Sequence, residues 1–311
     1  MPRVIMPLPT GVHLLDVSGP SQIFSSAAQL RGGWELVFVT SAGGVRSHQG
    51  LRLTGEPQWP TDDTPRDLVL VPGWHVTADD PMRVPLPDSV ISRLASHHAG
   101  GGVVGSVCAG ALALGAAGLL DGRRCTTHHA VQRRLAAAYP RATVVQDVLF
   151  TEDDRVVTSA GIASGIDLAL HLVAQHDGPQ TAARVARDTV VYARRNGDDP
   201  QDSVLIETRH HLDEAVHRVQ DVIDERFAER LSLLHLSSAA GVSERTLTRA
   251  FRAATGTTPL RYQQTIRLER ANRLIGGGST VEAAARAVGF EDGRMLRRLR
   301  ERAGGSTAER R

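Results

Sequence analysis

Short apolar runs alternate with segments of helical spacing along the first part of the chain. The apolar runs are rich in Val, Ile and Leu and nearly continuous, which is typical of strands covered on both faces. Strand and helix follow each other in turn, so the pattern predicts an α/β fold, a doubly wound, mainly parallel sheet with helices on both sides. The predicted strands are 3–8, 34–40, 67–73, 102–107, 143–147 and 155–161, and the predicted helices are 19–30, 87–99, 111–120, 130–139 and 162–176.

The polar stretch RRNGDDPQD (194–202) ends this pattern with turn-forming residues and a proline. Strand-like runs are absent from the sequence after it, and apolar residues recur only at helical spacing. We therefore expect an α/β domain over 1–195, a linker over 196–210, and an all-α domain over 211–311. The helices predicted in the last part are 212–227, 232–240, 243–255, 259–275, 280–288 and 291–303.

The helical part repeats itself. Each copy has a small helix, a glycine turn and an arginine-bearing helix, which is the layout of a helix-turn-helix. The copies predict two such motifs, at about 232–256 and 280–304. Four pairs of residues carry the repeat, each 48 positions apart: Gly241 and Gly289, Arg249 and Arg297, Phe251 and Leu299, and Gly256 and Gly304.

Charge is spread unevenly along the chain, whose net charge is only +2. Residues 211–311 carry 18 arginines against 13 acids, whereas residues 1–210 carry 18 against 21. A basic tail on a near-neutral front part indicates a nucleic-acid partner for the tail. The chain has no lysine, which excludes a lysine Schiff base and a Walker-type phosphate loop.

The second helix of each motif is the candidate DNA reader. In the first copy Ser243 is a helix N-cap, and Leu247 and Phe251 face inward together. The outward residues are then arginines and a threonine, which suit contacts with guanine edges, thymine methyls and phosphates. An ordinary solvated basic helix face is the alternative. The predicted DNA-binding residues are Ser243, Arg245, Thr248, Arg249, Arg294, Arg297 and Arg298.

Residues 211–311 resemble the DNA-binding domain of AraC/XylS-type transcription regulators, on the segments LHLSSAAGVSERTLTRAFRAATGTTPLRYQQTIRLERANRLI and VEAAARAVGFEDGRMLRRL. The resemblance implies seven helices, and two recognition helices in major-groove segments about 34 Å apart on double-stranded DNA. Members usually follow the second recognition helix with Pro and Tyr, as Pro259 and Tyr262 follow the first. Thr307 and Arg310 stand there instead. That helix also looks one residue short, with Gly293 inside it, which predicts a weaker second contact.

Cys108 stands where a predicted strand meets a predicted helix. A strand-to-helix turn that holds a nucleophile needs small neighbours, and Gly105, Ser106, Ala109 and Gly110 meet that need. The N-terminus of the following helix would point at the sulfur and lower the pKa of the thiol. The alternative is a buried structural cysteine.

The front part resembles the ThiJ/PfpI-type, class I glutamine-amidotransferase-like domain, in the version fused to AraC-type tails in bacterial regulators. The segments SVCAGALALGAAGLLDGRRCTTHH (106–129), LVLVPGW (68–74) and VVTSAGIASGIDLALHLV (156–173) carry the resemblance, which runs through about 3–195. It implies a flavodoxin-like sandwich. Asp16 matches the family's acidic residue on an early loop, Cys108 the elbow cysteine, and Pro72-Gly73 the backbone beside the oxyanion position. Thr126, Thr127 and His128 match a stretch usual in the regulators.

Turnover needs a base beside the cysteine. Active peptidase-like relatives place His directly after it, whereas Ala109 stands here. We therefore expect a non-catalytic pocket that senses a small metabolite through Asp16, Gly73, Cys108, Ala109 and His128. The alternative is a cysteine-dependent hydrolase or hydratase, with Cys108, Asp16 and His128 as its catalytic candidates.

Other expectations follow from composition and resemblance. No stretch is long enough to cross a bilayer, no signal peptide is evident, and two cysteines make no disulfide framework, so we expect a cytoplasmic protein without a membrane partner. Adjacent histidines point apart, which argues against a metal site. No cofactor is expected. The resemblance implies a homodimer, an effector among small nitrogen compounds such as amino acids or betaines, and RNA polymerase as a partner if the protein is an activator.

Overall fold

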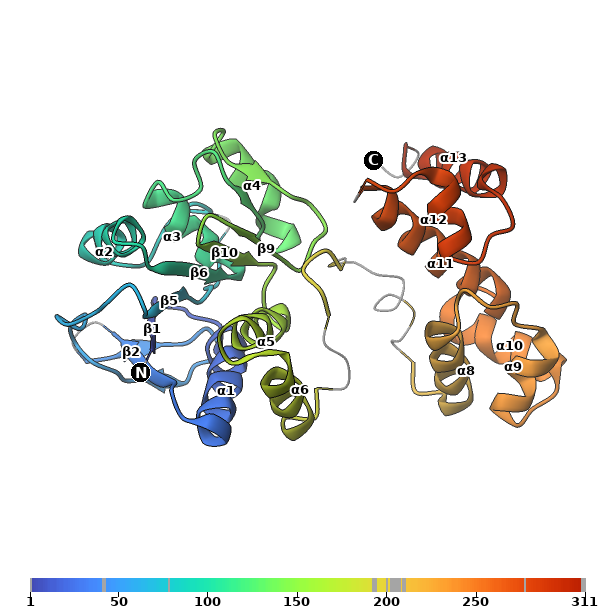
Figure 1. Ribbon diagram of the computed structural model, residues 1–311, viewed down its shortest axis with the longest axis horizontal. Coiled ribbons are helices and arrows are strands. Elements are labelled where there is room, and N and C mark those ends of the chain that lie inside the picture. The colour runs from blue at the N-terminus through green and yellow to red at the C-terminus, as the bar shows by residue number, and fades with distance from the viewer. Residues whose placement is uncertain are drawn as a thin grey trace. The chain divides into compact units, whose positions relative to one another are not determined.

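The computed structural model describes residues 2–40, 43–77, 79–191, 195–199, 201, 208, 211–276 and 278–308. The chain divides into two compact units, Met1–Gln201 and Asp202–Arg311 (Figure 1). Most of the predicted linker, 196–210, lies outside the described residues.

The first unit is built on a six-stranded sheet with the strand order β2-β1-β5-β6-β10-β9. Neighbouring strands are parallel except for β9, which runs antiparallel to β10 at one edge. The strands are β1 (Arg3–Pro7), β2 (Glu35–Val39), β5 (Leu68–Val71), β6 (Val103–Val107), β9 (Phe150–Asp153) and β10 (Val156–Ser159). Two short ladders stand apart, β3 (Val45–Arg46) with β4 (Arg52–Leu53), and β7 (Arg124–Cys125) with β8 (Thr143–Val144). The predicted doubly wound, mainly parallel fold is confirmed.

Helices cover the two faces of this sheet (Figure 1). One group comprises α1 (Leu14–Arg31), α5 (Ser164–Asp177) and α6 (Pro179–Asp188), which pack on one another. The other comprises α2 (Asp88–Ala99), α3 (Ala111–Ala116) and α4 (His129–Ala138). Strand residues between the layers, such as Ile5, Val69 and Val104, have no exposed surface, as the continuous apolar runs predict.

Several predicted elements differ from the structure. The predicted strand 143–147 forms only the two-residue β8, outside the main sheet, and the sixth strand is instead the unpredicted edge strand β9. The helix expected over 19–30 begins at Leu14, so Asp16 lies in its first turn rather than on a loop. The helix expected over 111–120 ends at Ala116, shortly before Gly118, whose φ of 72° does not continue a helix. Helix α6 was not predicted.

The second unit is helical. Helix α11 contributes to both of its cores: Tyr262 and Ile266 pack with Phe251 in one, and Ala271 packs with Leu296 in the other. Each helix-turn-helix therefore has a small core of its own on a shared helix. The described helices are α8 (Glu214–Glu225), α9 (Leu233–Ala240), α10 (Glu244–Thr255), α11 (Pro259–Gly276), α12 (Val281–Ala287) and α13 (Gly293–Ala308). Six of the seven helices that the resemblance implies are thus among residues 211–276 and 278–308.

The second motif has a longer turn than the first. Ser243 caps α10 by accepting the N–H of Thr246 at 3.2 Å, and Asp292 accepts the N–H of Met295 at 3.0 Å at the start of α13. These caps are 49 positions apart, whereas the turn glycines Gly241 and Gly289 are 48 apart. Leu247 and Leu296, both without exposed surface, are also 49 apart, so the recognition helices align with this offset.

The expectation that Gly293 lies inside a shortened second recognition helix is wrong. Gly293 is the first residue of α13, which runs for 16 residues. A glycine at that position does not carry the cost that it has in a helix interior.

Candidate functional site

The corner around Cys108 lies at the carboxyl ends of three parallel strands. Cys108 follows β6 with a φ of 56°, a left-handed backbone that is strained for a residue with a side chain. Gly73 follows β5 and Gly161 follows β10, and both glycines lie against Cys108. A Cβ added to Gly73 would lie 2.7 Å from the Cβ of Cys108, and one added to Gly161 would lie 2.4 Å from it. The predicted cramped elbow is present, and ligands of open α/β sheets bind at this edge.

Asp16 reaches the same corner from the first turn of α1 and has no exposed surface. Its Oδ1 accepts the backbone N–H of Ile162 at 3.0 Å. Burial raises the pKa of Asp16 to about 6, and the N–H groups of Ile162 and Gly73 and the thiol of Cys108 lower it by less. Its Oδ2 accepts no hydrogen bond of ordinary geometry from any described residue. The corner therefore holds a buried carboxyl oxygen with unused hydrogen-bonding capacity.

The electrostatics of Cys108 oppose nucleophilic chemistry. Burial, followed by the negative charge of Asp16, raises the pKa of the thiol far above its usual range, and the N–H of Ala109 lowers it by less. The expected low pKa is therefore wrong: the N–H at the helix start lowers the pKa of Cys108, but desolvation and the carboxylate of Asp16 outweigh it. The thiol is protonated at neutral pH.

His128 lies next to the corner but makes no catalytic contact. The hydroxyl of Thr127 donates to the carbonyl of Cys108 at 2.7 Å, which ties this segment to the elbow. The side chain of His128 caps α4, where its Nδ1 accepts the N–H of Ala130 at 3.3 Å. Burial and then the charge of His129 lower the pKa of His128, so its imidazole is neutral at neutral pH. No hydrogen bond joins His128 to Cys108 in the described part of the chain.

Three further imidazoles lie together close to this corner. His13 lies edge-on to His48, with 5.2 Å between ring centroids, and His48 stacks on His75 at 4.0 Å. The backbone N–H of His13 donates to the carbonyl of Gly73 at 3.0 Å. Burial, followed by the charges of His48, His75 and His128, lowers the pKa of His13. No group of side chains suited to a metal ion occurs among the residues described. This cluster could not be predicted from the sequence, because its members lie on three separate loops.

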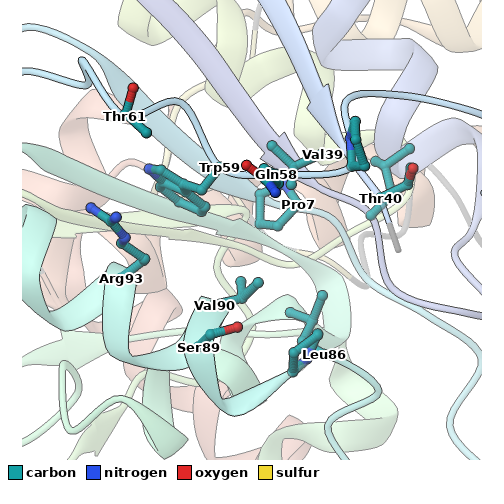
Figure 2. Close-up of a pocket in the computed structure, with 13 residues that line it drawn as sticks. Pro7, Val39, Thr40, Gln58, Trp59, Thr61, Leu86, Ser89, Val90 and Arg93 are labelled. Carbon is teal, nitrogen blue, oxygen red and sulfur yellow. The ribbon is translucent and has the colours of Figure 1, made fainter. Parts of the chain in front are cut away.

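A separate cavity of about 350 Å³ lies beyond the ends of β1 and β2 (Figure 2). Apolar residues from several segments line it, including Pro7, Trp59, Leu86 and Val90, with Arg93 among its polar residues. None of the predicted pocket residues lines this cavity. The Cys108 corner and the cavity are thus distinct features of the same sheet edge.

The predicted DNA-binding arginines are all exposed: Arg245, Arg249, Arg294, Arg297 and Arg298. Thr248 is half-buried and donates its hydroxyl to the carbonyl of Glu244 in its own helix at 2.8 Å. Arg297 forms an ion pair with Glu282 of α12. The other four arginines form no ion pair with a described residue. Both recognition helices thus present guanidinium groups to the surface.

Arg267 has a structural role, unlike the exposed arginines Arg245 and Arg249 of α10. From α11 it donates to the carbonyls of Phe227 at 2.6 Å, Gly289 at 2.9 Å and Glu229 at 2.7 Å. Its guanidinium also lies 5.7 Å from the ring centroid of Phe290, and burial lowers its pKa. Arg267 joins the segment after α8 to the turn of the second motif. A count of charges does not separate such a structural arginine from one that binds DNA.

Comparison with known proteins agrees with this geometry. Residues 2–175 match the DJ-1/PfpI family, and residues 236–310 match a helix-turn-helix domain. The HTH-type transcriptional regulator CdhR of Pseudomonas aeruginosa is 33% identical over 229 residues, which are 72% of this chain and 66% of that protein. Isonitrile hydratase of Pseudomonas putida is 36% identical over 180 residues, 56% of this chain and 72% of the enzyme.

A crystal structure of an AraC family transcriptional regulator from Pseudomonas putida shares the fold, with a TM-score of 0.52 and 23% identity. The match covers 61% of this chain and all of that one. Among the helices that the structure describes, none combines the length and apolar character that a bilayer-spanning helix requires. The chain spans just under two thirds of the length of CdhR. By its sheet, its cysteine elbow and the match over more than half its length, the chain belongs to the DJ-1/PfpI family and carries a C-terminal helix-turn-helix domain.

Proposed function

We propose that this protein is a sequence-specific DNA-binding transcription regulator. The observation that carries the proposal is the pair of helices α10 and α13, each the second helix of a helix-turn-helix and each presenting exposed arginines. Four of these guanidinium groups have no protein partner among the described residues, so they are available for base edges and phosphates. The names of relatives such as CdhR support the same function.

DNA binding is tested by selecting duplexes from a random pool with the full chain and measuring affinity for the selected site. Arg249→Ala removes an outward guanidinium of α10 and is expected to weaken binding by about 1–3 kcal/mol. Arg218→Ala is the matched control, because it removes the same charge from α8, where Arg218 is 53% exposed and 3.8 Å from Glu214. Equal affinities of Arg249→Ala and the unaltered chain would refute the placement of the first recognition helix.

The front unit is the sensor in this proposal, and its chemistry is that of binding rather than turnover. The residues that we propose to bind the ligand are Asp16, Gly73, Cys108, Ala109 and His128. The buried carboxyl of Asp16, whose Oδ2 accepts no hydrogen bond of ordinary geometry from a described residue, suits a ligand with an N–H or O–H donor or a cationic nitrogen. Small nitrogen compounds fit this requirement. A ligand that binds one arrangement of the protein better than another changes DNA affinity by that difference in binding free energy.

The ligand proposal is tested by a thermal-shift panel of free amino acids and betaines with the full chain. The unaltered protein is expected to be stabilised by a panel member that does not stabilise Asp16→Asn. The assembly that we propose is a cytoplasmic homodimer that binds double-stranded DNA, with RNA polymerase as a further partner if the protein activates transcription.

An enzyme is the second candidate, favoured by the 36% identity to isonitrile hydratase and by the strained backbone of Cys108. Two features weigh against it: burial and the charge of Asp16 raise the pKa of the thiol, and Ala109 supplies no base or hydroxyl beside it. An isonitrile hydration assay with the unaltered chain and with Cys108→Ala separates the two functions. Hydration that Cys108→Ala abolishes would make the front unit an enzyme.

A further inference from the structure

The two helix-turn-helix motifs are similar enough for matched positions to be compared. The first helices of the motifs start with equivalent caps: Ser232 accepts the N–H of His235 at 3.1 Å, and Thr280 accepts the N–H of Ala283 at 3.2 Å. These caps are 48 positions apart, so Glu282 of α12 stands where α9 has Leu234. Leu234 is 65% exposed. The second motif therefore carries a carboxylate at a place where the first has an exposed apolar side chain.

Glu282 is directed at the recognition helix of its own motif. Its carboxylate pairs with the guanidinium of Arg297, and both side chains are about half exposed. A Cβ on Gly293 would lie 3.0 Å from Oε1 of Glu282, so the carboxylate sits over the first residue of α13. With the offset of 49, Arg297 matches Thr248 of α10, so the pairing of Arg249 with Arg297 that the sequence repeat indicated is wrong by one residue. The additional cation of the second recognition helix is thus neutralised by its own motif.

The first residues of a recognition helix are the ones that approach base edges, and free N–H groups at a helix start attract phosphate. Three carboxylates lie near this end of α13. Asp292 caps the helix, and Glu291 pairs with Arg230. Glu282 adds a third carboxylate there. At the start of α10 only Glu244 follows the uncharged cap Ser243. A phosphate that approaches Arg297 therefore also meets the charge of Glu282.

We propose that Glu282 limits the contribution of the second helix-turn-helix to DNA affinity by holding and neutralising Arg297. The proposal rests on the DNA-binding function proposed above. With the offset of 49, Arg294 and Arg298 match Arg245 and Arg249, and none of these four forms an ion pair with a described residue. Under the proposal, Arg297 is the additional cation of the second motif, and Glu282 keeps it from strengthening DNA binding. Glu282 is then an affinity-setting residue, and it touches no DNA itself.

The test compares Glu282→Gln, which keeps the shape of the side chain and removes its charge, with the unaltered full chain. Binding is measured to a duplex of about 40 bp of arbitrary sequence and to a duplex selected from a random pool. If Arg297 gains one phosphate contact, the slope of log affinity against log salt steepens by about 0.9. We expect Glu282→Gln to bind about tenfold more tightly than the unaltered chain at about 50 mM salt, and about threefold more tightly at about 200 mM. Glu282→Leu, which copies the first motif, should behave in the same way.

Two controls separate the pair from a general effect of charge. Glu225→Gln removes the same charge from an exposed position on α8 and should leave the salt slope unchanged. In an Arg297→Ala background, Glu282→Gln should change affinity less than about twofold, since the cation that it releases is gone. A gain of equal size in that background, or in Glu225→Gln, overturns the proposal.

Weaker binding by Glu282→Gln also overturns it, because Glu282 would then orient Arg297 toward DNA. An unchanged affinity overturns it while leaving the proposed function intact. Failure of the unaltered chain to bind either duplex would instead refute the proposed function itself, and this inference with it.

Discussion

Replacing Asp16 by Asn is expected to stabilise the protein at neutral pH. Burial raises the pKa of Asp16 from 3.8 to about 6, so the folded protein favours the protonated form. The stability that this form provides is fully present below about pH 4 and is lost as the pH rises through about 6. A shift of about two units corresponds to about 3 kcal/mol at pH 7.5. Asn resembles the protonated carboxyl and keeps an oxygen for the N–H of Ile162.

The assay is urea unfolding of Asp16→Asn and the unaltered chain, followed by tryptophan fluorescence. The sequence has three tryptophans, and all of them lie in the first unit: Trp34, Trp59 and Trp74. The fluorescence signal therefore reports the unfolding of this unit alone. The free energy of unfolding of Asp16→Asn should exceed that of the unaltered chain by about 3 kcal/mol at pH 7.5 and by almost nothing at about pH 4. The same difference at both pH values, or a less stable variant at pH 7.5, would refute the reasoning.

Asp67→Asn is the matched control with the opposite sign. Burial alone would raise the pKa of Asp67, but hydrogen bonds from the Arg3 guanidinium and from the N–H groups of Thr64 and Arg3 outweigh it and lower the pKa to about 2. The stability from this carboxylate is present above about pH 4 and is lost as the pH falls through about 2. Asp67→Asn should therefore destabilise the first unit at pH 7.5, whereas Asp16→Asn stabilises it.

Two further substitutions test the packing of the corner and of the helical unit. Gly161→Ala should destabilise the first unit by more than about 2 kcal/mol, because Gly161 has a φ of 115° and the new Cβ would lie 2.4 Å from that of Cys108. Gly118→Ala, with a φ of 72° and open space at the Cβ, should cost only about 1 kcal/mol in the same fluorescence assay, and equal losses would contradict the clash. Arg267→Ala should destabilise the second unit by about 2–3 kcal/mol, because three carbonyls lose a charged donor. Thermal unfolding followed by circular dichroism measures this loss, and a change no larger than that of Arg218→Ala would show that Arg267 is not a structural residue.

The local features of the fold could be predicted from the sequence. Apolar runs predicted β1, β5, β6 and β10, whose residues are almost all buried, and also the edge strand β2, which is only partly buried. The glycine turns and helix caps predicted α10 and α12 to within a few residues. The small residues around Cys108 indicated a crowded elbow, since only small side chains fit beside a strained turn. All of these depend on residues that are close in the chain.

What tertiary structure decided is the contact between distant segments. The sign of the pKa shift of Cys108 follows from burial and from Asp16, which β1 and α1 bring to the corner from far away in the chain. The imidazoles of His13, His48 and His75 meet only because three loops end at one edge of the sheet. Arg267 counted toward the basic charge of the tail and Arg297 was predicted to bind DNA, yet Arg267 donates to three carbonyls and Arg297 pairs with Glu282. Periodicity records which face of an element is buried, but the partners of each polar group depend on which elements the fold brings together.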